Sequence, residues 1–175
     1  MTIRYSWMIL IAALAWAGDW SAPVEVRHDE DVAVSYQARL DGPWLVVRAK
    51  VGSGWHTFAM DNKRRADEKL AGKQALSVDR QTEIAAAGLE IEGPWYQTLP
   101  KDFSHPELRW FSWGFDKEAV FAAKVRRGAS GRLTVKGQAC TESICKNVGV
   151  AVTVPASKGG SATPEIALKD LIQVR

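Results

Sequence analysis

Regular alternation of apolar and polar residues limits the fold of this chain more than any other feature of its sequence. Residues 31–40 (DVAVSYQARL) follow this pattern, which is typical of a strand with one buried face. The side chains expected on that face are Val32, Val34, Tyr36 and Ala38. A turn at Asp41-Gly42-Pro43 leads to residues 44–51 (WLVVRAKV), where β-branched and aromatic residues resume. The two segments therefore predict a β-hairpin.

Further short segments of the same kind follow along the chain, separated by turn residues. Gly52-Ser53-Gly54 forms one such turn before the predicted strand at residues 55–60. The other predicted strands cover residues 76–79, 89–92, 119–126, 132–139 and 148–154. Strands this short and this closely spaced are typical of two packed antiparallel sheets. The predicted fold class is therefore all-β, a β-sandwich.

One short helix is expected between the strands. Asp61 can cap a helix over residues 62–71, and Gly72 can end it. Most of its side chains are charged, and Ala66 and Leu70 are the apolar residues that recur on one face. We expect an inserted helix that lies on the sheet and keeps its charged side chains in solvent.

Residues 95–115 (WYQTLPKDFSHPELRWFSWGF) differ from the rest, because they combine many aromatic residues and two prolines with no sustained alternation. They predict a long aromatic cap loop, and long loops in compact domains are often lids or binding loops. An alternative is a loop whose aromatic side chains plug the open end of the sandwich, and both descriptions can hold together. Stacking of a carbohydrate on Trp110 and Trp113 is a further alternative.

The first 17 residues have the organisation of a secretory signal peptide. Arg4 precedes an apolar run over residues 7–17 (WMILIAALAWA), which ends in the small-x-small site Ala15-Trp16-Ala17. The run has 11 residues, too few for a transmembrane helix, which needs about 20. The alternative is a buried N-terminal helix. We expect cleavage after Ala17 and a periplasmic or secreted protein.

The remaining chain is expected to contain one domain. Residues 18–156 predict the β-sandwich, and residues 157–175 a linker followed by a tail. Residues 157–164 (SKGGSATP) have the composition of a linker, and the tail, residues 165–175, is a candidate for a short amphipathic helix.

Charge and composition exclude several classes of function. The chain carries 23 basic and 20 acidic residues, a formal net charge of +3, which is too even for a nucleic-acid-binding surface. Two cysteines and three histidines are too few for a dense disulfide scaffold or a zinc ribbon. No segment after residue 17 has the length and hydrophobicity of a membrane span. We expect the mature protein to be a monomer with no membrane span.

The two cysteines are the residues to which the sequence assigns chemistry. Cys140 ends one predicted strand and Cys145 precedes the next, with four residues between them (QACTESICKN). A hairpin-like connection of that length brings the two Cα atoms within the roughly 4.4 to 6.8 Å that a disulfide requires. An exported protein meets oxidising conditions, in which such a bond persists.

Three roles are open for this cysteine pair on spacing alone. As a staple it contributes little, since the chain-entropy relation gives about 2 kcal/mol for a loop of about six residues and about 4.7 kcal/mol for a loop near 100. A short loop at the rim of a sandwich instead exposes the sulfurs, which favours thiol-disulfide exchange. The third role is a soft-metal site with His56 and His105, for which copper is the expected ion.

Nearby charges favour Cys145 as the nucleophile. Lys146, next to Cys145, and Lys136 favour a thiolate, whereas Glu142 opposes one. The sequence contains no C-x-x-C motif, so the pair is not a thioredoxin site.

Three stretches resemble the periplasmic N-terminal domain of the membrane thiol:disulfide interchange protein DsbD and its relatives, the disulfide bond corrector family. They are residues 54–58 (GWHTF), 93–103 (GPWYQTLPKDF) and 137–155 (GQACTESICKNVGVAVTVP). The similarity covers residues 32–155 in order. It implies an immunoglobulin-like β-sandwich with one short inserted helix and a long aromatic cap loop.

The resemblance also implies which residues surround the cysteines. In the family, a flexible cap loop with an acidic residue followed by Phe shields the pair, and Asp102 and Phe103 occupy the matching places. Phe58 matches an aromatic residue that lines the site, whereas His56 stands where the family often has Tyr.

Taken together, these implications predict periplasmic thiol-disulfide exchange through Cys140 and Cys145. In the family the second cysteine forms the mixed disulfide with partners, so Cys145 is the implied attacking residue and Cys140 the resolving one. The chain would act as a component of a protein-disulfide reductase system, with a separate thioredoxin-like protein as electron donor or acceptor. No cofactor is expected besides the cysteines. The alternative is a secreted immunoglobulin-like binding module whose disulfide is a structural staple.

Overall fold

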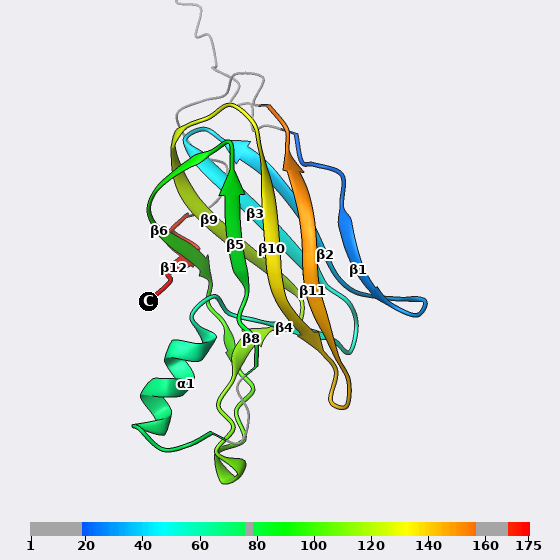
Figure 1. Cartoon of the computed structure of the whole chain (residues 1–175), viewed down its shortest axis with the longest axis vertical. Coiled ribbons are helices and arrows are strands. Elements are labelled where there is room, and N and C mark those ends of the chain that lie inside the picture. Colours follow the sequence, from blue (N-terminus) through cyan, green and yellow to red (C-terminus); the bar gives the residue numbers. More distant parts are fainter. Residues whose placement is uncertain (1–18, 76–78, 157–167) are drawn as a thin grey trace, which may run out of the picture.

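Two antiparallel β-sheets face each other in the computed structural model, which describes residues 19–75, 79–156 and 168–175 (Figure 1). The first sheet has the order β1 (Val24–His28), β2 (Asp31–Asp41), β3 (Trp44–Val51), β9 (Glu118–Arg127), β6 (Glu90–Thr98) and β12 (Leu171–Gln173). The second has the order β11 (Cys145–Val154), β10 (Gly131–Cys140), β4 (His56–Phe58), β8 (Trp113–Phe115) and β7 (Lys101–Asp102), and β5 (Glu83–Ala87) also pairs with β10. The predicted all-β, immunoglobulin-like sandwich with one short helix is confirmed.

The alternating segment at the start of the domain forms the predicted hairpin. β2 and β3 pair from Val34 and Val51 to Asp41 and Trp44, across a turn at residues 42–43. Gly42 has a φ of 56°, in the left-handed region that glycine adopts without a steric penalty. This turn fixes the register, and the apolar side chains of the hairpin therefore reach the core.

Side chains from the inner faces of the two sheets fill the core. Fully buried members include Tyr36, Leu45, Phe121, Leu133, Val135 and Val152. Burial raises the pKa of the Tyr36 phenol to about 12, and a hydrogen bond with Thr57 opposes that rise. The phenol is therefore neutral under ordinary conditions and behaves as a core side chain.

The helix α1 (Asn62–Leu70) forms where the sequence predicts it, with different ends. Ala71, with a φ of 49°, is the left-handed residue that closes it, one position before the predicted Gly72. Asp61 stands at the N-cap position but makes no capping hydrogen bond. α1 lies beside β8 at one end of the sandwich rather than across a sheet (Figure 1). Asn62 ties it there, because its side chain accepts a hydrogen bond from the Trp113 backbone N–H at 2.7 Å.

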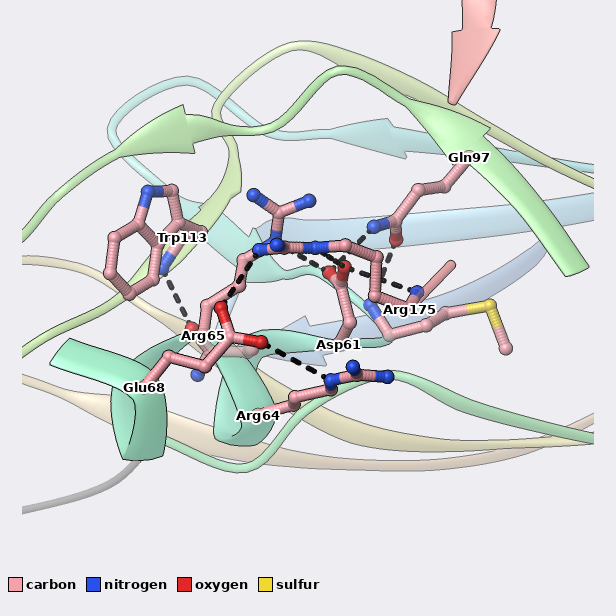
Figure 2. A network of polar contacts seen from close by, with 9 residues as sticks. Asp61, Arg64, Arg65, Glu68, Gln97, Trp113 and Arg175 are labelled. Atoms are coloured by element: carbon pink, nitrogen blue, oxygen red, sulfur yellow. Dashed lines mark hydrogen bonds and ion pairs between the residues drawn. The ribbon is translucent and has the colours of Figure 1, made fainter. Parts of the chain in front are cut away.

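The Asp61 carboxylate is instead the centre of a buried polar network (Figure 2). Its side chain is 0% exposed and accepts hydrogen bonds from Arg65 Nε and Gln97 Nε2, each at 2.8 Å. Arg175 lies 3.9 Å from the same carboxylate through its Nε. The sequence predicted that Asp61 caps the helix. In the structure its carboxylate instead links α1, β6 and the C-terminal segment.

The aromatic segment is more regular than the sequence predicted. Residues 95–98 belong to β6 and pair with β9. β7 and β8 then pair as a two-stranded ribbon, and only residues 103–112 between them form a loop, with the turn η1 (Pro106–Leu108) inside it. The pairing of β6 shifts register between Glu92 and Trp95. Such a bulge breaks the two-residue period, which is why the strand predicted at residues 89–92 stopped short of the rest of β6.

Three further strands, β1, β5 and β12, have no counterpart in the prediction. β5 (EIAAA) is rich in alanine, which has weak β propensity. In the tail, the short turn η2 (Leu168–Asp170) leads into β12, so the described part of the tail is a sheet strand and not the expected amphipathic helix. The signal peptide, residues 76–78 of the strand predicted at residues 76–79, and the linker lie outside the described residues, and Asp79 is not in a strand.

Candidate functional site

A disulfide joins Cys140 and Cys145 at the end of the second sheet, as predicted. Cys140 is the last residue of β10 and Cys145 the first of β11, and the two are paired directly across the hairpin. Their Cα atoms lie 4.0 Å apart, slightly closer than the predicted range. The bond therefore closes a connection within one hairpin and joins no distant segments.

The four residues between the cysteines form a tight turn. The Thr141 N–H donates to the Ile144 carbonyl at 2.8 Å. The Thr141 Oγ1 in turn accepts hydrogen bonds from the backbone N–H groups of Ser143 and Ile144, at 3.3 and 3.1 Å. Ile144 is 44% exposed. The turn is thus held by its own hydrogen bonds and projects beyond the sheet.

The two cysteines differ sharply in exposure. Cys140 is only 2% exposed, whereas Cys145 is exposed to solvent. An incoming thiolate must approach one sulfur along the axis of the S–S bond and displace the other. Of the two residues, Cys145 is therefore the one that lies at the surface.

The disulfide lies in the wall of a pocket of about 880 Å³. One side of this pocket is the turn that carries the cysteines, and another comes from residues 103–105, 110 and 112 of the segment between β7 and β8. We call residues 101–115, which contain these two strands and the loop joining them, the cap hairpin. Other residues that line the pocket are Trp55, His56, Asp79 and Asp116.

An indole ties the loop of the cap hairpin to the body of the domain, in addition to the pairing of β8 with β4. Trp110 Nε1 donates a hydrogen bond to Asp79 Oδ2 at 2.7 Å, across 31 residues of sequence. Asp79 is 7% exposed, so this hydrogen bond to a carboxylate is largely shielded from solvent. Within the cap hairpin, His105 and Trp110 form an isolated bridge. Opening of the cap hairpin requires the bond between Trp110 and Asp79 to break.

The structure brings some of the predicted site residues together and separates others. His56 and Phe103 line the pocket, and their rings stack with centroids 5.0 Å apart. Phe58 is 1% exposed and does not line the pocket, but its ring packs edge-on against that of His56, with centroids 5.3 Å apart. Asp102 does not line the pocket; it is exposed, and its carboxylate accepts a hydrogen bond from the Ser104 N–H at 2.9 Å.

Burial and charge act in opposite directions on His56. Burial has the larger influence and lowers the pKa of His56 below that of an ordinary histidine, while the charges of Asp79 and Asp116 oppose this. A hydrogen bond from Lys101, at 2.7 Å, lowers the pKa of Asp116. Burial therefore favours the neutral form of His56, while Lys101 favours the ionised form of Asp116.

Sequence reasoning missed Asp79, Trp110 and Asp116 as pocket residues. Their signal was weak, because they lie at separate positions along the chain and only the fold brings them to the pocket. The metal alternative is not supported: in the part of the chain that the structure describes, no three His, Cys, Asp or Glu side chains are grouped as metal ligands.

Comparison with known proteins gives a match in structure only. No protein-family model and no curated protein sequence matches the chain. The N-terminal periplasmic domain of ScsB from Proteus mirabilis is similar with a TM-score of 0.52 and 13% identity, over 78% of this chain and 51% of that chain. The N-terminal domain of DsbD from Neisseria meningitidis, in its reduced form, gives a TM-score of 0.49 and 11% identity, over 82% of this chain and 91% of that chain.

The likeness to ScsB shows the fold of the domain. This chain has the two-sheet β-sandwich of a periplasmic N-terminal domain, and it spans about half the length of the ScsB chain that it matches. Among the described residues, no helix has the length and hydrophobicity needed to cross a membrane.

Proposed function

We propose that this domain carries out thiol-disulfide exchange through the Cys140 and Cys145 pair. The observation that carries the proposal is the difference between the two cysteine residues: Cys145 is exposed and Cys140 is 2% exposed, in a hairpin disulfide at the edge of a pocket. A structural bond gains nothing from an exposed sulfur, whereas an exchange site needs one sulfur that a partner can reach.

The exchange has two steps. A thiolate of a donor protein attacks Cys145 Sγ, the S–S bond breaks, and its electron pair leaves on Cys140 Sγ, which takes up a proton. The donor's second thiolate then attacks the donor sulfur in the mixed disulfide, and Cys145 leaves as a thiolate. The donor dithiol becomes a disulfide and the pair in this domain becomes two thiols, so two electrons are transferred. The reverse sequence passes the electrons to an acceptor disulfide.

Partners of the thioredoxin class fit this reaction, because they present a reactive dithiol on their surface. The sequence resemblance to the DsbD family supports the same class of partner, and the fold shared with the ScsB periplasmic domain supports a periplasmic location. The domain would act as a monomer with its cysteines as the only redox group.

The reduction potential of the pair tests the proposal. We expect a potential between about −270 and −120 mV, the range from thioredoxin to strong disulfide donors. Equilibration in glutathione and dithiothreitol buffers, followed by alkylation and mass measurement, gives the value. A potential below about −300 mV is that of a structural bond. That result would contradict exchange and favour the alternative of a binding module with a local staple.

The cap hairpin gives a second prediction. Trp110→Phe removes the indole N–H that donates a hydrogen bond to the Asp79 carboxylate. A hydrogen bond to a charged group is worth about 1.5 to 3 kcal/mol. If a partner protein must displace the cap hairpin, reduction by a thioredoxin-like protein should become faster by on the order of tenfold. Reduction by dithiothreitol should change little, because a small dithiol reaches Cys145 without that movement.

The matched control for this prediction is Trp44→Phe. Trp44 of β3 packs edge-on against Tyr96 of β6, with ring centroids 5.8 Å apart. Both strands belong to the first sheet, so the same chemical change is made away from the pocket. Equal reduction rates for Trp110→Phe, Trp44→Phe and the unchanged protein would show that the cap hairpin does not limit access.

A further inference from the structure

Cys140 lies between two partners in the second sheet. On one side β10 pairs with β11, which places Cys140 opposite Cys145, and on the other side it pairs with β4, which places Cys140 opposite His56. Residues directly opposite each other in antiparallel strands share a face of the sheet, with Cβ atoms about 4.5 to 5.5 Å apart. His56, Cys140 and Cys145 therefore form a row, and all three line the same pocket.

The position of the His56 ring is fixed by aromatic neighbours. Phe103 of the cap hairpin stacks on it with an interplanar angle of 24°, and Phe58 meets it at 86°. The ring is half-buried. An imidazole held in this way, next to a sulfur that must gain and lose a proton, is placed for proton transfer.

Cys140 needs a proton acceptor more than Cys145 does. In the reduced domain both cysteines are thiols or thiolates, and only the thiolate is a nucleophile. Burial disfavours the charged form, so a thiol that is 2% exposed keeps its proton. Cys145 is exposed and has Lys146 beside it, and it can ionise with help from solvent.

The charged groups around the pocket do not raise the pKa of His56 enough to outweigh its burial, so the neutral form that accepts a proton is favoured. Asp79, before β5, and Asp116, after β8, act on it through their charges, and Lys101 of β7 pairs with Asp116. Glu142 and His105 also line the pocket, both on exposed segments. The burial of His56 outweighs the two aspartates and lowers its pKa.

We propose that His56 is the general base for Cys140 in the resolving step, an inference that rests on the exchange reaction proposed above. The Cys145 thiolate first attacks the disulfide of an acceptor and releases its first sulfur as a thiolate. Cys140 Sγ then attacks Cys145 Sγ while its proton passes to the imidazole of His56. The bond between Cys145 and the acceptor breaks, and the acceptor's second sulfur leaves with the electron pair. The imidazolium returns its proton to solvent or to that sulfur, so the acceptor gains the two electrons that the cysteine pair loses.

Reaction of the reduced protein with 5,5′-dithiobis(2-nitrobenzoate) separates the two steps without any partner protein. Attack by Cys145 releases the first thionitrobenzoate, and resolution by Cys140 releases the second, so stopped-flow absorbance gives two phases. Cys140→Ala, which lacks the resolving thiol, assigns the second phase. The variants are His56→Phe, which keeps a ring for the stack on Phe103, and His56→Gln, which keeps a polar side chain. The control is His28→Gln, which changes a histidine of β1 that does not line the pocket.

We expect both His56 variants to slow the resolving phase by on the order of 100-fold at pH 7, and to leave the first phase within about threefold of the unchanged protein. Their resolving rate should rise about tenfold per pH unit, because hydroxide must remove the proton. In the unchanged protein that rate should instead level off above the pKa of His56. The control should match the unchanged protein in both phases.

A normal resolving rate in either His56 variant overturns this role, because neither new side chain accepts a proton. The unchanged protein gives an independent test: a resolving rate that keeps rising with pH through the neutral range also overturns it. If the unchanged protein shows no first phase, the exchange reaction itself fails, which is a different outcome from a normal first phase with an unaffected second one.

Discussion

A Cys140→Ala variant is expected to hold a thioredoxin-like protein in a stable mixed disulfide through Cys145. Cys145 is the exposed member of the pair, so its sulfur can meet a partner, and the removed Cys140 is the residue that would otherwise release that partner. The opposite variant, Cys145→Ala, leaves a thiol that is 2% exposed. It should form the mixed disulfide at least about 100-fold more slowly, since both thiolate formation and access are impaired.

The trapping experiment uses a thioredoxin-like protein whose second active-site cysteine is serine, activated as its mixed disulfide with thionitrobenzoate. Release of thionitrobenzoate gives the rate, and non-reducing electrophoresis with mass spectrometry identifies the joined cysteine. The unchanged reduced protein should form the same species only transiently, because Cys140 resolves it. If Cys140→Ala traps none of several such partners, or if Cys145→Ala traps them equally fast, the assignment of roles is wrong.

The strands that alternate regularly were predicted almost to the residue. Residues 31–40, 119–126 and 132–139 correspond to β2, β9 and β10, which differ from them by no more than one residue at either end. Along most of β10, burial alternates as the sequence does, whereas β2 and β9 also bury residues of the other face, such as Ala33 and Ala122. Where the backbone departs from a flat ladder, as at the register shift in β6, the period is lost and the prediction fails.

The cysteine pair was predicted from local sequence, and His56 and Phe103 were assigned from the resemblance, whereas the tertiary contacts that place these residues were not predicted. The disulfide lies within one hairpin, so its cysteines could be paired from spacing. The place of His56 beside Cys140 comes from the pairing of β4 with β10, which joins residues 84 positions apart (140 − 56). The bond between Trp110 and Asp79 likewise joins segments whose own sequences carry no sign of each other. Asp102, assigned to the site from the resemblance, does not line the pocket and accepts a hydrogen bond from the nearby Ser104 N–H.

Asp61→Ala is expected to lower the free energy of unfolding by about 3 to 5 kcal/mol at pH 7, the cost of breaking a buried ion pair from one side. The Asp61 side chain is 0% exposed and that of Arg65 14% exposed. Without the carboxylate, the Arg65 cation and the Gln97 amide lose the acceptor that both bind (Figure 2). Urea denaturation with the disulfide intact gives the measurement. The control is Asp67→Ala, which breaks an exposed pair with Lys63 and should cost less than about 1 kcal/mol.

The effect of Asp61→Ala should also depend on pH. Burial alone raises the pKa of the carboxyl, but the hydrogen bonds from Arg65 and Gln97 and the charge of Arg65 hold the pKa of Asp61 below its usual value of 3.8. A carboxyl whose pKa is lower in the folded state stabilises the fold fully above its unfolded pKa, and this contribution is lost as the pH falls through the folded value. The difference between Asp61→Ala and the unchanged protein should therefore be constant from about pH 7 to pH 5 and shrink below about pH 4. A difference under about 1 kcal/mol at pH 7, or one that does not shrink in acid, would mean that the charge of Asp61 is not what holds α1, β6 and the C-terminal segment together.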